Sequence, residues 1–338
     1  VLPGRTSEFG RLGTIKYCIR TMLMSLHISK LAVDIIAEDQ IILPAFKGST
    51  FRGAIGNSLK NMVCIRRDRD CGSCLIKHKC SYTFLFETSV FMDKKALPAG
   101  VPQPFVLEPP LEEKEVYEPG ELISFALVLI GKGIDHLPYF LATFDRMSQR
   151  GLGRGKGKFT LHEVRDGYSY TVVYNQADGI VNPNISRKSI TEDFTSGQSA
   201  QMRYCKIQFK TPLRLKNNGQ LSDRIDFEIL MRAILRRINS LSYYFADEAL
   251  QLNQQGLVSK AKSIGIVNQN IRWLDWERYS NRQNNRMKLG GIVGLIEFEG
   301  DLNPFWPLLL AGQEIHIGKN TTFGLGMYKL TTGFRNEI

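Results

Sequence analysis

Residues 290–330 read GGIVGLIEFEGDLNPFWPLLLAGQEIHIGKNTTFGLGMYKL, and this stretch contains the pattern that decides the fold. Residues 291–299 form a short apolar run rich in β-branched side chains, which predicts a partly buried strand. Asn303 followed by Pro304 is typical of a helix start, and Gly312 is typical of a helix stop. A short helix is therefore expected between them, followed by a loop and a last strand.

The loop after this helix has the composition of a phosphate-binding segment. Three glycines lie within residues 318–326 together with Lys319, Thr321 and Thr322, and His316 comes just before them. Glycine lets backbone N–H groups approach an anion, while the lysine and the hydroxyls add charge and donors. The spacing is not that of a Walker A loop. A glycine-rich turn ahead of the last strand is the simpler alternative.

The same stretch resembles the C-terminal region of CRISPR-associated endoribonucleases of the RAMP superfamily, which process precursor crRNA. The resemblance rests on the Gly-Gly-Ile-Val-Gly start, Asp301, the Pro-Leu-Leu-Leu helix, and segments 316–319 and 323–326. It implies two ferredoxin-like (RRM-like) domains in tandem and CRISPR repeat RNA as the partner, with other CRISPR effector or adaptation proteins as further candidates. It also implies cleavage without a metal, in which the ribose 2′-hydroxyl attacks the phosphate and leaves a 2′,3′-cyclic phosphate.

Composition bounds the class of protein. The 338 residues carry a formal net charge of +11, and 43% of them are hydrophobic, which is enough for a full core and favours two domains. Such a charge indicates a polyanionic partner, although a merely basic soluble enzyme would look similar. No apolar run is long enough to cross a membrane and no signal-peptide pattern opens the chain, so a cytoplasmic location and no membrane partner are expected.

The order of elements is predicted to repeat. Each half runs strand, helix, strand region, helix, glycine-rich loop and strand, which is close to the β-α-β-β-α-β order of a ferredoxin-like unit used twice. We therefore expect an α+β fold with a first domain over residues 16–165, a connecting segment over 166–200 and a second domain over 201–338.

The first predicted helix starts at Ser49 and continues to about Met62, because apolar residues recur at helical spacing. Lys47 and Arg52 lie at its start, where cations oppose the helix macrodipole unless an anion docks there. This pattern indicates a phosphate contact, although two side chains that simply reach water would also explain it. Asp135 is the expected N-cap of the next helix.

A second segment, residues 151–158, also combines glycines with cations. Arg154, Lys156 and Lys158 belong to it, and Arg150 precedes it on a predicted helix. Its spacing does not fit the dinucleotide-binding motif G-x-G-x-x-G. We favour contact with a phosphate backbone over a flexible basic turn, and we expect the two glycine-and-cation loops to form a common cradle for RNA.

Residues 271–286 interleave aromatic rings with cations, among them Arg282. Such a mixture suits stacking on unpaired bases and phosphate contact. A core pair of Trp273 and Trp276 with a solvated charged edge is the competing explanation.

Four cysteines are spaced C-x6-C-x2-C-x5-C within residues 64–80. In a reducing compartment this spacing predicts a metal-binding insertion, and structural zinc is favoured over an iron–sulfur cluster or unligated thiols. Four thiolates leave no open position for water, so the zinc would stabilise the fold and take no part in catalysis. The predicted ligands are Cys64, Cys71, Cys74 and Cys80.

Catalysis by 2′-hydroxyl attack needs a base, an acid and cations around the phosphorane. Known members of the RAMP endoribonucleases carry a catalytic histidine near the first helix, but residues 46–60 contain none here. His316 is the hypothesised acid/base, with Lys47, Arg52 or Lys319 supplying positive charge. The alternative is that His316 points into a strand interface and that the enzyme uses Lys47 or works slowly.

Two other functions compete with an endoribonuclease. One is a non-catalytic RNA-binding RAMP subunit of a CRISPR effector complex, because the same fold serves there. The other is a zinc-stabilised DNA-binding regulator, which the lack of a basic recognition helix disfavours.

Overall fold

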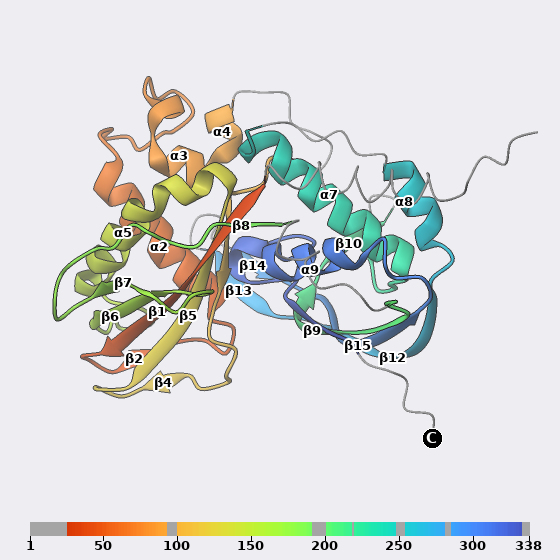
Figure 1. Cartoon of the computed structure of the whole chain (residues 1–338). Helices are drawn as coiled ribbons and strands as arrows, with labels where there is room; N and C mark the ends of the chain where they lie inside the picture. Colours follow the sequence, from red (N-terminus) through yellow and green to blue (C-terminus); the bar gives the residue numbers. More distant parts are fainter. Residues whose placement is uncertain are drawn as a thin grey trace, which may run out of the picture.

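The computed structural model describes residues 26–92, 100–190, 201–217, 220–247, 254–280 and 285–332, without the side chains of 216, 217, 220 and 277–288. Two antiparallel sheets, each with helices packed on it, lie side by side (Figure 1). Among the described residues, no helix is both long and apolar enough to cross a membrane.

The first sheet is built around β1 (His27–Ala37), which pairs antiparallel with both β5 and β6. Alternate β1 side chains are apolar and fully buried, as expected for a central strand. The strand order is β3-β5-β1-β6-β7, and the short β8 also pairs with β1. The partners are β3 (Phe105–Glu108), β5 (Leu122–Ile130), β6 (Phe159–Asp166), β7 (Val172–Asn175) and β8 (Lys188–Ser189).

Helices α2 (Gly48–Val63) and α5 (Leu137–Arg150) pack together on the first sheet (Figure 1). Short helices follow α2 or precede α5 along the chain. They are η1 (Lys77–Lys79), α3 (Ser81–Phe86), α4 (Thr88–Met92) and η2 (Gly131–His136).

The second sheet has the order β12-β15-β9-β16, with all pairs antiparallel. Its strands are β9 (Tyr204–Leu213), β12 (Gly265–Leu274), β15 (Gly291–Glu299) and β16 (Tyr328–Thr332). Its helices are α7 (Phe227–Phe245), α8 (Gln254–Ala261) and α9 (Trp306–Ile315), and η3 (Thr321–Phe323) lies in the glycine-rich loop.

Both halves follow the order β-α-β-β-α-β, as β1-α2-β3-β5-α5-β6 and as β9-α7-β12-β15-α9-β16. The predicted mixed class with antiparallel sheets is therefore confirmed. Strands β7 and β8 lie in the predicted connecting segment 166–200 but add to the first sheet. Three small two-stranded sheets complete the fold of the described residues: β2 (Ile41–Ile42) with β4 (Val116–Tyr117), β10 (Leu215–Asn217) with β11 (Gln220–Ser222), and β13 (Glu277–Ser280) with β14 (Asn285–Lys288).

Several predicted helix ends are wrong. Helix α9 begins at Trp306, not at Asn303, whose side chain donates to Asp301 and accepts from Met202 N–H. The helix continues through Gly312, where a Cβ would lie 2.5 Å from the Tyr328 hydroxyl oxygen.

The two predicted N-caps in the first domain are also wrong. Helix α2 begins one residue before Ser49, and its N-cap, Lys47, makes no side-chain capping hydrogen bond. Helix α5 has His136 as its N-cap, because η2 occupies the chain up to that point, and Asp135 instead forms an ion pair with Arg187.

One apolar core runs through both domains. At the end of α7, Phe245 packs edge-on against Phe84 of α3 at 5.7 Å between ring centroids. A Cβ at Gly131 of η2 would lie 2.3 Å from the Phe245 carbonyl oxygen, so the backbone of η2 contacts the backbone at the end of α7 directly. The two domains are therefore in close contact at this point.

Candidate functional site

The glycine-rich loop of the second domain is seated on the start of α2 in the first domain. A Cβ at Gly48 would lie 1.9 Å from the Phe323 carbonyl oxygen, so only glycine permits this approach. The Arg52 guanidinium lies 5.3 Å from the centre of the Phe323 ring and 4.9 Å from that of Phe86. The first helix and the last loop, far apart in the sequence, thus form one structural unit.

The loop keeps this position through backbone contacts that need glycine. At Gly324 (φ +85°) a Cβ would meet Pro109 at 2.4 Å, and at Gly326 (φ +72°) it would meet the Ile317 carbonyl at 1.8 Å. The Thr211 hydroxyl donates to the Gly324 carbonyl at 2.7 Å. The glycines of this loop are therefore explained by close packing and positive φ, which is the simpler of the two sequence interpretations.

Of the three loop residues predicted to bind RNA, only Lys319 has an exposed side chain. The side chains of Thr321 and Thr322 are buried, with exposed fractions of 5% and 4%. The Lys319 ammonium can therefore contact an external phosphate. The Thr321 and Thr322 hydroxyls could donate to one only if the loop rearranged.

His316 lies inside the boundary between the domains. Its ring has no exposed surface; Nδ1 donates to the Leu325 carbonyl at 3.3 Å, and Nε2 lies 3.4 Å from the Glu108 carboxylate. This is the strand-interface placement that competed with the catalytic hypothesis. An imidazole enclosed in this way cannot reach an RNA phosphate unless the domains separate.

Glu108 at the end of β3 anchors this buried network. Burial disfavours its charged form, but the His316 ring and the Lys30 ammonium outweigh that cost and hold the pKa of the carboxyl at about 2. The Lys30 nitrogen lies 2.7 Å from the carboxylate. Burial alone would lower the pKa of Lys30, but the charge of Glu108 outweighs this effect and the pKa is raised. No sequence pattern marked Glu108 or Lys30, because they lie on different strands and His316, the further partner of Glu108, lies in the second half of the chain.

Lys47 is also covered. Its ammonium donates to the Glu112 carbonyl at 2.5 Å and to the Ala45 carbonyl at 3.5 Å. Burial lowers the pKa of Lys47, while Glu112 and Glu115 oppose that shift. Unlike His316, Lys47 lies beneath a stretch, residues 111–116, whose own side chains are exposed.

The second glycine-and-cation segment presents its charges to solvent. Arg150, Arg154, Lys156 and Lys158 are all exposed. The segment is fixed by a bridge between Arg154 and Ile42, and a Cβ at Gly153 would meet the Ile42 carbonyl at 2.2 Å. Because Gly48 carries the other loop, both loops attach to the short stretch 40–48.

The two tryptophans of the predicted aromatic segment have different environments. Trp276 stacks on Phe46 of the first domain, with ring centroids 4.1 Å apart, and forms part of a small apolar cluster with Leu289 and Leu325. Trp273 is 38% exposed, and its indole N–H donates to Asp275 at 2.9 Å. Arg282 lies outside the described residues, so its predicted role stays a prediction.

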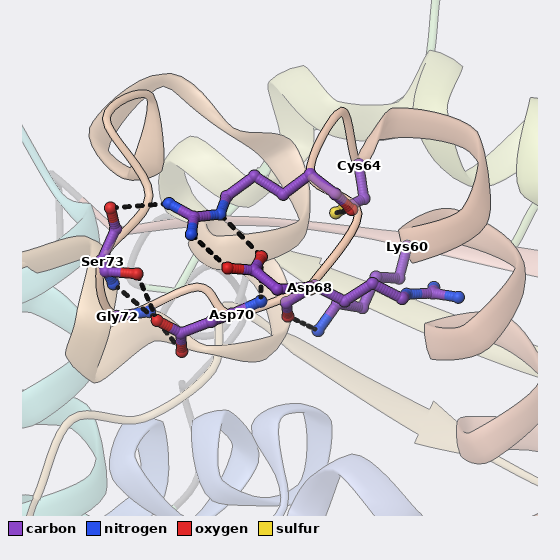
Figure 2. A network of polar contacts seen from close by, with 8 residues as sticks. Lys60, Cys64, Asp68, Asp70, Gly72 and Ser73 are labelled. Carbon is purple, nitrogen blue, oxygen red and sulfur yellow. Dashed lines mark hydrogen bonds and ion pairs between the residues drawn. The ribbon is translucent and has the colours of Figure 1, made fainter.

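The cysteine-rich insertion is ordered by polar contacts around two aspartates (Figure 2). The Asp70 carboxylate accepts from the backbone N–H groups of Gly72 and Ser73, at 3.2 and 3.0 Å, and Arg66 forms an ion pair with Asp68. Lys60 of α2 donates to the Arg69 carbonyl at 2.9 Å. These contacts tie the insertion to the end of α2.

The four predicted ligands do not form a metal site as they are placed. Cys64, Cys71, Cys74 and Cys80 are partly buried free thiols, and burial raises the pKa of Cys71. Within the part of the chain that the structure describes, no three His, Cys, Asp or Glu side chains converge as metal ligands. Zinc binding therefore stays a prediction from the sequence.

Comparison with known proteins gives two family matches. Residues 207–328 match the family model of the CRISPR-associated endoribonuclease Cas6, and residues 26–186 match a model described as an N-terminal domain. A protein of Archaeoglobus fulgidus described as uncharacterized is 23% identical over 317 residues, covering 91% of this chain and 99% of that protein.

Solved structures with the same fold include Cas6 of Thermus thermophilus, with a TM-score of 0.51 at 13% identity, covering 90% of this chain and 99% of that one. A partial Cas6-RT-Cas1–Cas2 complex gives a TM-score of 0.59 at 13% identity over 93% of this chain. The chain spans 48% of the matched chain in that complex and 30% of the one in a further Cas6-RT-Cas1–Cas2 complex.

Two β-α-β-β-α-β units make up most of the described chain, and the glycine-rich loop of the second unit is seated on the first. With the family match over the second domain, the resemblance seen in the sequence is confirmed. Residues 207–328 are therefore of the Cas6 type, and the chain as a whole shares the fold of the solved Cas6 structures.

Proposed function

We propose that this protein is an endoribonuclease that binds CRISPR repeat RNA and cleaves precursor crRNA by attack of the ribose 2′-hydroxyl, without a catalytic metal. The Cas6 match over residues 207–328 supports the activity at the level of the family. The seat of the glycine-rich loop on Gly48 supports it in structural terms, since this contact brings the loop that carries Lys319 against the helix that carries Arg52. We further infer that the two units act as tandem ferredoxin-like domains.

We propose different roles for the three residues predicted to be catalytic. Lys47 is the candidate proton-transfer group, because burial lowers its pKa and only an exposed stretch covers it. Moving an exposed stretch costs far less than opening a packed core. Arg52 supplies positive charge to the phosphorane. His316 acts as a positioning residue that fixes the glycine-rich loop to the first domain through Glu108.

The decisive experiment is incubation with end-labelled CRISPR repeat RNA in EDTA under single-turnover conditions. Cleavage with a 2′,3′-cyclic phosphate end is expected, and a 2′-deoxy substitution at the cleaved position should abolish it. Lys47→Ala should lower the rate by about 10²–10⁴-fold, the usual contribution of general acid–base catalysis. Lys329→Ala, on an exposed position of β16, is the matched control and should cleave like the wild type.

A second function is favoured by one observation: Lys47 and His316 both have no exposed surface. A non-catalytic RNA-binding RAMP subunit needs neither side chain free. It would bind the repeat RNA in the same assay and leave it intact. The Cas6-RT-Cas1–Cas2 neighbours suggest that adaptation proteins are further partners of this chain.

A further inference from the structure

A cavity of about 430 Å³ opens at the boundary between the domains, formed by η1, η2, α3, α4 and the end of α7. These elements gather at the top of Figure 1, where α3 and α4 lie beside α7. Its size falls within the roughly 300–1,000 Å³ typical of small-molecule sites. The polar side chains that line it include three imidazoles and three cations: His27, His78, His136, Lys79, Lys132 and Arg187.

The aromatic wall of this cavity is held in place by neighbouring groups. The His136 ring stacks on Phe84, with centroids 4.4 Å apart and planes 8° apart. Its Nδ1 donates to the Lys132 carbonyl at 3.3 Å, because a carbonyl can only accept. His78 is similarly fixed, since its Nδ1 donates to the Phe91 carbonyl at 2.6 Å.

The cations in the cavity are held by weak, exposed ion pairs. Arg187 pairs with Asp135 at 3.1 Å, and both side chains are more than half exposed. Lys132 lies 3.8 Å from Asp247 of the second domain. Exposed pairs of this kind contribute about 0–1 kcal/mol, so a phosphate can replace either carboxylate at small cost. The lining also has one more cation than carboxylates, because Lys79 lies beside these two pairs.

We propose that this cavity holds one nucleotide of a single RNA strand. The phosphate lies on Lys132 and Arg187, and the base packs against the aromatic wall that His136 and Phe91 form. The site is separate from the glycine-rich loops, because none of its lining residues belongs to either loop. It also gives the cysteine-rich insertion a function, since His78 and Lys79 belong to that insertion. The inference rests on the proposed RNA binding but not on cleavage.

The test is the affinity for a fluorescein-labelled ten-nucleotide strand of 2′-O-methyluridine, which 2′-hydroxyl attack cannot cleave, measured by fluorescence anisotropy. The double variant Lys132→Gln/Arg187→Gln should bind at least tenfold more weakly than the wild type. The slope of log affinity against log salt should flatten by about 0.7, the value for one lost phosphate contact on a single strand. His136→Ala keeps the charge and should also lose about tenfold, in the range measured for stacking on one base.

The matched control is Arg236→Gln/Lys262→Gln, which removes the same charge from the face between α7 and α8. It should change the affinity less than twofold. Equal losses in the two double variants would mean that only overall charge matters, and wild-type affinity in the cavity variants would exclude the site. Circular dichroism of each variant separates lost binding from lost folding. Cavity-dependent binding without cleavage of repeat RNA would overturn only the proposed activity, and cleavage with unchanged binding would overturn only the cavity.

Discussion

Gly48 and Gly53 lie on the same helix but have opposite surroundings. A Cβ at Gly48 would collide with the Phe323 carbonyl, whereas a Cβ at Gly53 would meet nothing within 4 Å. Gly48→Ala should therefore destabilise the protein by about 1–3 kcal/mol, as overpacking does. Gly53→Ala should stabilise it by roughly 0.5–1 kcal/mol, because alanine favours helix.

Urea unfolding gives the free energy of unfolding of both variants, and the single-turnover cleavage rate shows whether the glycine-rich loop has moved. Gly48→Ala should slow cleavage, while Gly53→Ala should leave it unchanged. Equal stability of the two variants would contradict the close contact between α2 and the glycine-rich loop.

Glu108 gives the stability a dependence on pH. Its carboxyl has a pKa of about 2 in the folded protein, against about 4.5 without the fold. The charged carboxylate therefore stabilises the protein above pH 4.5, and this contribution, on the order of 3 kcal/mol, is lost as the pH falls from about 4.5 to 2.

Urea unfolding at pH 7, 4.5 and 3 tests this dependence. Glu108→Gln should be less stable than the wild type at pH 7, and its stability should fall less steeply with acid. Glu113→Gln, on the exposed stretch 111–116, should keep the slope of the wild type. If the free energy of unfolding of Glu108→Gln changed with pH as it does in the wild type, the Glu108 carboxylate would be excluded as the source of the pH dependence.

The cysteine-rich insertion is the element for which sequence and structure differ most. The spacing of Cys64, Cys71, Cys74 and Cys80 predicts one zinc ion per chain, while the described side chains do not converge on one point. We expect protein purified without chelator to hold about one zinc ion by mass spectrometry of metals. Cys71→Ser/Cys74→Ser should lose it and melt at a lower temperature. A metal-free wild type with the same melting temperature would exclude the site.

Most elements could be predicted from the sequence, because their periodicity is local. Ile229, Ala233 and Ile238 recur near helical spacing, which predicts a helix where α7 lies. Asp226 caps this helix by accepting from the Ile229 N–H at 2.7 Å. The predicted helix end at Gly312 was wrong. The glycine lies inside α9, where it makes room for the Tyr328 hydroxyl of β16, and local sequence does not contain that contact.

The candidate site was less predictable than the elements. The loops with their cations were found from composition, and the structure confirms that Lys319 and Arg154 are exposed. The contact of His316 with Glu108 joins two domains, and no local pattern contains it. The same holds for the stacking of Trp276 on Phe46, since the two residues lie far apart in the sequence.

At the scale of the whole molecule, the apolar core that joins the domains should make them unfold together. Two-domain proteins often unfold in steps, but here one buried cluster contains residues of both sheets. The described tryptophans, Trp273, Trp276 and Trp306, all belong to the second domain. Their fluorescence and the far-UV circular dichroism of the whole chain should therefore give the same urea midpoint. Separate midpoints would show that the shared core does not couple the domains.

The seat of the glycine-rich loop on Gly48 also bears on how a ligand arrives. Because the Phe323 carbonyl leaves no space for even a methyl group at Gly48, the loop is held rigidly against α2. An incoming strand would then meet a preorganised surface and spend little binding energy on ordering it. The association rate of the strand would be governed by long-range attraction to the basic protein, so it would be high at low ionic strength and low at high ionic strength.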